Sequence, residues 1–162
     1  MNKAWIGLGS NLGASIAILG ESIQHIAQLE RTRLDQVSPA YRTRAWGVID
    51  QPDFINAVAL LETRLSPLAL LDQLQALEQR HRRVRARRWG PRTLDLDLLL
   101  FDDSTLALPR LVVPHPDLTH RAFVVVPLLE LAPQLALPNG ERLAAAADAL
   151  TADGLTPLLP DA

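Results

Sequence analysis

The chain has no cysteine, only 4% aromatic residues and a single lysine, Lys3. Without cysteine there can be no disulfide framework, no thiolate nucleophile and no cysteine-ligated zinc, so any metal must have oxygen or imidazole ligands. No stretch reaches the roughly 18 uninterrupted apolar residues of a membrane span, and the N-terminal residues lack the long apolar run of a secretory signal. At 162 residues, 48% of them hydrophobic, the sequence predicts one cytoplasmic domain over residues 1–162, with no membrane partner.

Positive charge is concentrated in one segment, although the net charge is −2. Seven arginines lie between Arg80 and Arg92. The planar guanidinium group suits bidentate contacts with phosphate or carboxylate better than the ammonium of lysine does. A charge run taken alone is more often a solvated loop, so this segment indicates a polyanion only together with other features.

The hydrophobic pattern predicts an alternation of strands and helices. Strands are expected at 4–8, 34–41, 54–61 and 93–101, and helices at 14–29 and from Ser66 to about Arg80, before an arginine-rich loop. Farther on, the pattern predicts short extended pairs at 106–108 and 111–113, a helix within 123–131 after an initial extended piece ended by Pro127, a closing helix at 141–150 and an irregular tail at 157–160. This order is typical of an α+β, ferredoxin-like split βαβ sandwich: an antiparallel sheet with helices on one face, the other face left for ligands, and a C-terminal helical extension.

Two carboxylates stand two positions apart in the strand predicted at 93–101. Period-two geometry puts Asp95 and Asp97 on one face, about 6.6 Å apart along the strand, and points the neighbouring leucines 94, 96 and 98 into the core. Two like charges there would be costly to keep ionised unless a cation bound them, and magnesium binds one or two carboxylates plus substrate phosphates. An isolated Asp-x-Asp is more often a solvated face. Here, however, the arginine segment ends at Arg92, directly before the strand, which favours phosphoryl transfer.

Four motifs resemble those of one enzyme family and occur in the order that the family has. They are Gly9-Ser10-Asn11-Leu12, Asp50-Gln51-Pro52-Asp53-Phe54-Ile55-Asn56, the highly specific ten-residue block from Arg88 to Asp97, and Val113-Pro114-His115-Pro116. The resemblance, to 6-hydroxymethyl-7,8-dihydropterin pyrophosphokinase, covers nearly the whole chain. It implies a ferredoxin-like α+β fold and transfer of diphosphate from ATP to the hydroxymethyl group of a dihydropterin, with release of AMP, in tetrahydrofolate biosynthesis.

The same resemblance implies a role for each matching position. Asp95 and Asp97 would bind two magnesium ions, and Arg83 and Arg92 would act with them in catalysis. The expected ATP contacts are Glu78, Arg85, Arg88, Arg92, Arg110, His115 and Arg121, with Arg83 and Arg85 on a loop that closes over the site. The expected pterin contacts are Thr43 and Trp46, on a second loop, and Phe54, Asn56, Trp89, Asp95 and Phe123.

Two alternatives from other classes stay open at this point. A ferredoxin-like sheet with a basic loop can bind RNA, but the low aromatic content, the negative net charge and the missing K/R-G-F/Y-G/A-F-V-x-F/Y signature argue against it. A different Asp-x-Asp nucleotidyl transferase would release pyrophosphate rather than AMP. The sequence has no Walker loop and no protein-kinase loop. We therefore expect a monomer that binds ATP and a dihydropterin alcohol, and no nucleic acid.

Overall fold

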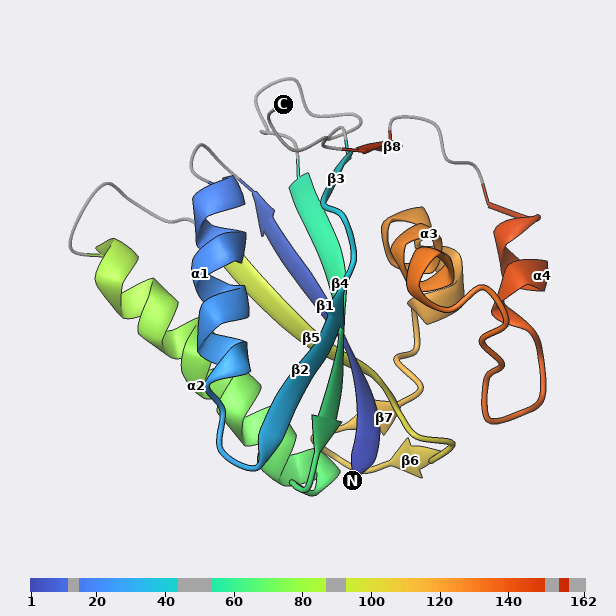
Figure 1. The fold of residues 1–162 in the computed structure, drawn as a ribbon, viewed down its shortest axis with the longest axis horizontal. Coiled ribbons are helices and arrows are strands. Elements are labelled where there is room, and N and C mark those ends of the chain that lie inside the picture. The colour runs from blue at the N-terminus through green and yellow to red at the C-terminus, as the bar shows by residue number, and fades with distance from the viewer. Residues whose placement is uncertain (12–14, 44–53, 87–92, 151–154, 158–162) are drawn as a thin grey trace.

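A six-stranded antiparallel sheet forms the centre of the molecule (Figure 1). The computed structural model describes the chain except residues 12–14, 44–53, 87–92, 151–154 and 158–162. The strands are β1 (Asn2–Asn11), β2 (Thr32–Val37), β3 (Tyr41–Thr43), β4 (Phe54–Thr63), β5 (Thr93–Phe101) and β8 (Leu155–Pro157). They lie in the order β5-β1-β4-β3-β8, and β2 also pairs with β4. The order places β1 between β5 and β4, as a split βαβ arrangement requires, so the predicted fold class is confirmed.

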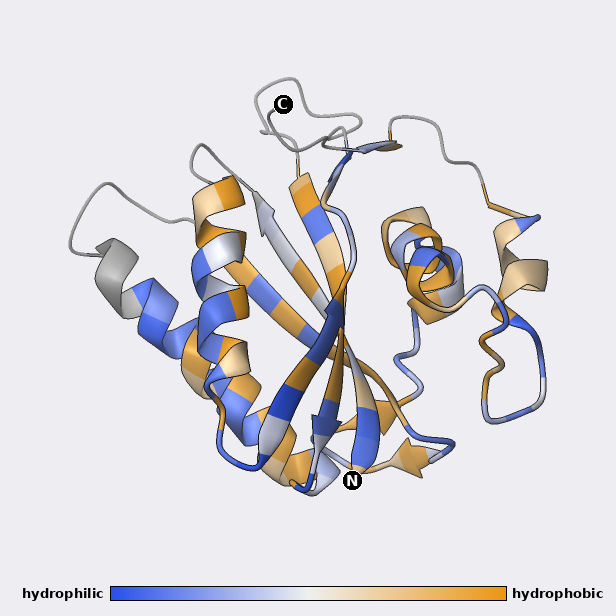
Figure 2. Cartoon of the chain, in the orientation of Figure 1, coloured by the Kyte–Doolittle hydropathy of each residue, from blue (hydrophilic) through white to orange (hydrophobic). Residues whose placement is uncertain are grey.

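Helices α1 (Ser15–Ala27) and α2 (Pro67–Ala86) cover one face of the sheet (Figure 1). The α2 helix begins at Pro67 because proline suits the first helical position, and the Ser66 hydroxyl accepts a hydrogen bond of 3.2 Å from the Ala69 amide. Apolar and polar residues alternate along the strands (Figure 2). The apolar set facing these helices includes Leu94, Leu96 and Leu98, all buried as predicted.

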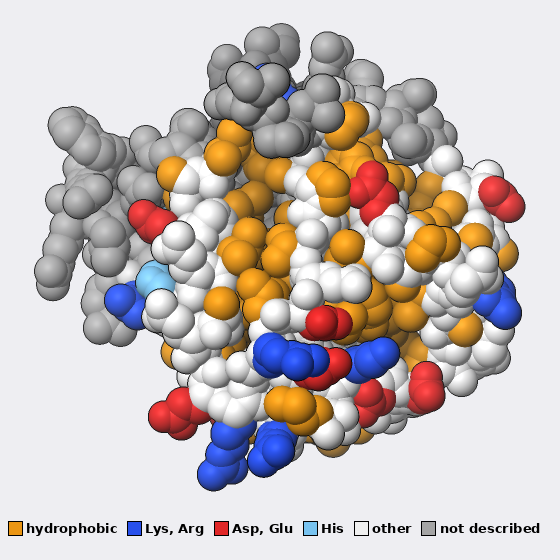
Figure 3. Space-filling view, in the orientation of Figure 1, with side chains coloured by type: hydrophobic (Ala, Val, Ile, Leu, Met, Phe, Trp, Pro, Cys, Tyr) orange, Lys and Arg blue, Asp and Glu red, His pale blue; other side chains and the backbone are white. Residues whose placement is uncertain are grey.

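The C-terminal helical extension packs on the opposite face of the sheet. It comprises a 3-10 turn (Leu118–His120), α3 (Ala122–Leu131) and the short α4 (Leu143–Ala147). Its apolar side chains, among them Val125 and Leu128, bury Trp5, Leu60 and Leu99 of the strands. In the orientation of Figure 1, apolar side chains are visible at the surface on the α1 side of the sheet and on its α3 side (Figure 3). An apolar strand surface must be covered, so only the remaining polar and glycine-rich part of this face is left for a ligand.

Several element boundaries differ from the sequence predictions. The strand expected at 34–41 is two strands, β2 and β3, because Pro39 has no amide proton to donate to a strand ladder. Between the two strands, the Ser38 amide donates to the Val58 carbonyl of β4, and the Ser38 hydroxyl accepts from the Val58 amide. The α2 helix continues to Ala86, so the arginine-rich segment begins within a helix rather than in a loop. Straight-chain arginines cost little in a helix, and positive charge near the C-terminus of a helix interacts favourably with the helix dipole.

The C-terminal third also departs from expectation. Pro127 lies inside α3, with no extended piece before it, because the apolar face of the helix is buried against the sheet and packing outweighs the missing amide. The closing helix is only Leu143–Ala147. Of the tail predicted as irregular at 157–160, the structure describes only Pro157, which ends β8, a strand that pairs with β3. The predicted short extended pairs are β6 (Leu106–Ala107) and β7 (Val112–Val113), which form a two-stranded sheet. No helix in the described part of the chain is long and apolar enough to cross a membrane.

Candidate active site

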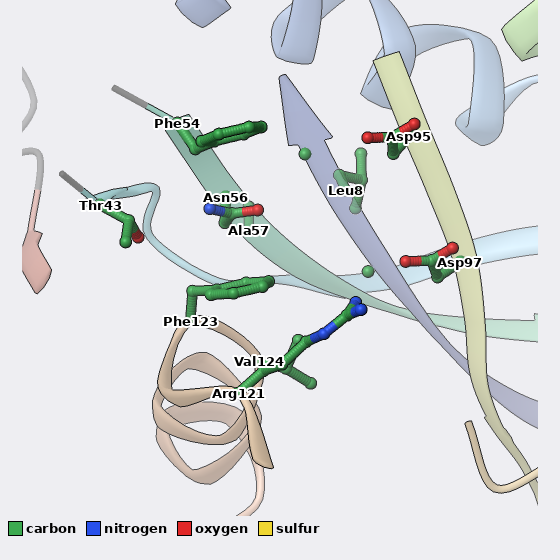
Figure 4. Close-up of a pocket in the computed structure, with 12 residues that line it drawn as sticks. Leu8, Thr43, Phe54, Asn56, Ala57, Asp95, Asp97, Arg121, Phe123 and Val124 are labelled. Carbon is green, nitrogen blue, oxygen red and sulfur yellow. The ribbon is translucent and has the colours of Figure 1, made fainter. Parts of the chain in front are cut away.

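A pocket of about 300 Å³ opens on the uncovered part of the sheet, between the ends of β1, β4 and β5 and the start of α3 (Figure 4). Its lining combines glycines, aromatic rings and two carboxylates. The lining residues are Gly7, Leu8, Gly9, Thr43, Phe54, Asn56, Ala57, Asp95, Asp97, Arg121, Phe123 and Val124. Such a concave, largely apolar site with a few convergent polar groups is typical of small-molecule binding.

Strand register explains why the pocket is hollow. Gly9 of β1 pairs with Asn56 of β4 on one side and with Asp95 of β5 on the other. Residues directly opposite each other in an antiparallel sheet share a face, so the central strand adds no side chain between the amide and the carboxylate. Gly7 of β1 likewise pairs with Asp97 of β5. Sequence reasoning missed both glycines as site residues, although glycine inside a strand signals a close approach.

Asp95 and Asp97 point into the pocket from β5 (Figure 4). Partial burial and the charge of Asp97 raise the pKa of Asp95 above its usual range. A cation between these carboxylates would favour their charged forms. Magnesium usually takes one or two carboxylates plus substrate phosphates, so the pair fits this ion. In the described ranges no group of three His, Asp or Glu residues could hold a metal.

Glu78 of α2 lies on the outer side of the same strand. Its Oε2 accepts a hydrogen bond of 2.9 Å from the Leu96 amide, which satisfies a donor on the edge strand β5. Burial raises the pKa of Glu78 most, the bond from Leu96 lowers it, and the charges of Asp95 and Asp97 raise it further. Three carboxylates therefore repel one another around β5, and a positively charged ligand would relieve that repulsion.

Two aromatic rings form the opposite walls of the pocket. Phe54 of β4 and Phe123 of α3 face each other, with Asn56 on the wall between them (Figure 4). Thr43 pairs with Phe54 across β3 and β4, and its buried hydroxyl oxygen has no partner among the described residues. The guanidinium group of Arg121 lies 5.7 Å from the centre of the Phe123 ring. This arrangement can hold a flat heterocycle by offset stacking and bond its edge through the amide and the hydroxyl.

A second cavity, about 350 Å³, lies on the other side of Asp97. Besides Asp97, its polar lining includes Gln75, Glu78, Arg110 and His115. The Arg110 side chain donates hydrogen bonds to Asp72 and Gln75 of α2. The His115 amide donates to the Leu99 carbonyl at 2.9 Å, and its Nδ1 accepts from the Asp117 amide at 3.2 Å. Asp97 thus lines both cavities.

The structure brings most of the expected site residues together. The first cavity collects Thr43, Phe54, Asn56, Asp95, Asp97, Arg121 and Phe123, and the second collects Glu78, Arg110 and His115 with Asp97. Thr43 ends β3 rather than lying in a loop, because it pairs with both β4 and β8. Arg83 and Arg85 lie in the last turns of α2, not in a loop. Trp46, Arg88, Trp89 and Arg92 lie outside the described residues.

The fold and site together define an α+β group-transfer enzyme with a slot for a flat ring beside a pair of carboxylates. Comparison with known proteins then gives the family. The model of the 7,8-dihydro-6-hydroxymethylpterin-pyrophosphokinase (HPPK) family matches residues 5–133, and the chain belongs to this family.

Two bacterial relatives are about half identical to this chain over the aligned residues. A protein of Haemophilus influenzae is 49% identical over 141 residues, covering 87% of this chain and 88% of its own length. One of Pseudomonas aeruginosa is 50% identical over 143 residues, covering 88% of each. Both are named 2-amino-4-hydroxy-6-hydroxymethyldihydropteridine pyrophosphokinase. The folic acid synthesis protein fol1 of Schizosaccharomyces pombe is 37% identical over 153 residues, which are 21% of its length.

Solved structures support the fold. A crystal structure of HPPK-DHPS in complex with substrates has a TM-score of 0.72 at 11% identity, covering 91% of this chain and 43% of that one. A Plasmodium falciparum HPPK-DHPS structure has the same TM-score at 14% identity. The chain therefore spans less than half the length of these HPPK-DHPS chains, and at this identity the likeness concerns the fold alone.

Proposed function

We propose that this chain transfers the diphosphoryl group of ATP to 6-hydroxymethyl-7,8-dihydropterin, giving AMP and the pterin diphosphate, a step in tetrahydrofolate synthesis. The observation that carries the proposal is the position of Asp97, which lines both the aromatic slot and the cavity containing Arg110 and His115. A group that lies between an acceptor site and a donor site can act on the transferred phosphoryl group. Family membership supplies the particular substrates.

The aromatic slot would bind the pterin. Phe54 and Phe123 would stack on the two faces of the ring, while Asn56 and the Thr43 hydroxyl would bond its polar edge. The hydroxymethyl group would then point along the pocket toward Asp95 and Asp97. By resemblance, Trp46 and Trp89 would close the slot.

The second cavity would bind the phosphates of ATP. Glu78, Arg110 and His115 line it, and Arg121, the residue just before α3, reaches toward Asp97 (Figure 4). By resemblance, Arg83, Arg85, Arg88 and Arg92 would add guanidinium groups, which neutralise phosphate charge in such reactions.

The transfer would be an in-line displacement. The pterin hydroxyl oxygen forms a bond to the β-phosphorus of ATP, and the bond from that phosphorus to the α–β bridging oxygen breaks, so that AMP leaves with that oxygen. The hydroxyl proton passes to solvent or to a carboxylate. Asp95 and Asp97 would hold two magnesium ions, which when bound lower the pKa of the hydroxyl and neutralise phosphate charge.

We also infer that residues 1–162 form a single pyrophosphokinase domain, because β8, near the C-terminus, belongs to the same sheet as β1. A monomeric, cytoplasmic enzyme without a nucleic-acid partner remains a prediction.

The direct test is AMP release from ATP and magnesium, measured with and without 6-hydroxymethyl-7,8-dihydropterin. Pterin-dependent AMP is expected. Release of pyrophosphate in place of AMP would identify a nucleotidyl transferase, and no product from folded protein with both substrates would refute the activity.

A further inference from the structure

Tyr41 of β3 and Glu130 of α3 are joined by a hydrogen bond in which the tyrosine hydroxyl donates to the carboxylate. Neither residue lines the pocket. Tyr41 is 5% exposed, whereas Glu130 lies on the surface. The bond links two elements that come from opposite sides of the site and are 89 residues apart in the sequence.

On the sheet side, Tyr41 belongs to the same wall as the pterin-facing residues. It pairs directly with Asn56, and Thr43 pairs with Phe54, in the ladder between β3 and β4. Opposite and alternate residues of an antiparallel pair share one face, so Tyr41 lies on the face that presents Thr43, Phe54 and Asn56 to the pocket.

On the helix side, Glu130 lies on the same side of α3 as Phe123. The two residues are seven positions apart, which is close to two full turns of an α-helix. Because Phe123 forms the opposite aromatic wall, a bond at Glu130 fixes the helix that carries this wall.

We propose that the Tyr41–Glu130 hydrogen bond sets the spacing between the Phe54 wall and the Phe123 wall, and that both residues are positioning residues for the flat ring. This inference rests on the proposed function. A stacked ring tolerates little change in the gap, because dispersion attraction falls steeply when a gap of even half an ångström opens. The bond is partly buried and has a carboxylate acceptor, which makes it stronger than a neutral, exposed one.

The test is equilibrium binding of 6-hydroxymethyl-7,8-dihydropterin, followed by its fluorescence, alongside binding of a non-hydrolysable ATP analogue. Tyr41→Phe and Glu130→Ala are each expected to weaken pterin binding about threefold to tenfold. The double variant should be no weaker than either single one, because each change removes the same bond. Glu130→Gln keeps an acceptor and should restore most of the affinity. Affinity for the ATP analogue should stay unchanged in all four variants.

Glu62→Ala is the matched control. It removes a carboxylate and an ion pair with Arg33, at the opposite end of β4 from Phe54, and should leave pterin affinity unchanged. If wild type binds pterin and the Tyr41 and Glu130 variants bind it equally well, or if their effects add, the inference is wrong and the proposed function stands. Equal losses of pterin and ATP affinity would also overturn it, by indicating general loosening. If wild type neither binds the pterin nor releases AMP, the proposed function fails and the inference fails with it.

Discussion

Gly9 of β1 lies so close to Asn56 of β4 that a Cβ atom at Gly9 would stand 2.8 Å from the Asn56 Oδ1 atom. Asn56 is 7% exposed and has little room to move away. The glycine therefore allows the Asn56 amide to lie over β1, on the face of the sheet that also carries Asp95.

Gly9→Ala is expected to displace the Asn56 amide, weaken pterin binding at least about tenfold and lower the free energy of unfolding by about 1–3 kcal/mol. Isothermal titration and urea unfolding would measure the two effects. Gly20→Ala is the control, because a Cβ at this exposed position of α1 meets nothing within 4 Å. It should leave binding unchanged and stabilise the fold by about 0.5–1 kcal/mol. Normal pterin affinity in Gly9→Ala would show that Asn56 does not contact the ring.

Asp95→Asn is expected to lower turnover, by less than Asp97→Asn does, yet stabilise the protein in the absence of metal. Burial and the neighbouring charge of Asp97 raise the pKa of Asp95, so its charged form is disfavoured in the fold. Because much of the Asp95 side chain is still exposed and solvent screens the repulsion, the gain in the free energy of unfolding should be no more than about 1 kcal/mol. Urea unfolding with a metal chelator would measure it at neutral pH. Added magnesium should reduce the difference in the free energy of unfolding between variant and wild type, since the ion stabilises only the pair of carboxylates that wild type has. A variant less stable than wild type in the presence of the chelator would contradict this account.

Asp97→Asn should cause the larger loss of activity, because Asp97 lines both cavities. Removing a ligand shared by donor and acceptor sites is expected to reduce kcat by about a hundredfold or more, by analogy with the loss of one charge-stabilising group. Steady-state AMP release at saturating magnesium would measure it. Near-normal turnover would refute the proposed metal ligands.

The pH dependence of stability should reveal the Tyr41–Glu130 contact. Burial, followed by the hydrogen bond and the charge of Glu130, raises the pKa of Tyr41 to about 12. The fold thus favours the neutral phenol. The stabilisation that results is complete below about pH 10, the pKa of tyrosine in the unfolded chain, and is lost as the pH rises toward about 12. The free energy of unfolding should fall by about 1 kcal/mol more in wild type than in Tyr41→Phe between about pH 9 and about pH 11. If the free energy of unfolding of the two proteins changed with pH in parallel, the raised pKa of Tyr41 would be contradicted.

Glu78 should matter to stability through its acceptor oxygen rather than its charge. Glu78→Ala leaves the Leu96 amide of the edge strand without its partner and should cost about 1 kcal/mol in thermal or urea unfolding. Glu78→Gln keeps an acceptor and removes a repulsive charge near Asp95, so it should be at least as stable as wild type. A loss in Glu78→Gln equal to that in Glu78→Ala would show that the charge itself stabilises the fold.

The sequence by itself determined the elements whose periodicity is local. The alternation around Asp95 and Asp97 set which side chains of β5 are buried, and the apolar stripes of α1 and α2 set which helix faces meet the sheet. Specific motifs also indicated the family before any geometry was known.

Tertiary structure alone decided the features that depend on pairing between distant segments. Register placed Gly7 and Gly9 beside the carboxylates, and the β8 strand joined β3 although the sequence predicted no strand there. Packing kept Pro127 inside α3, and the same packing brought Glu130 to Tyr41. A local pattern determines which way a side chain faces along its own element, whereas the free energy of long-range contacts determines which elements meet and what lies between them.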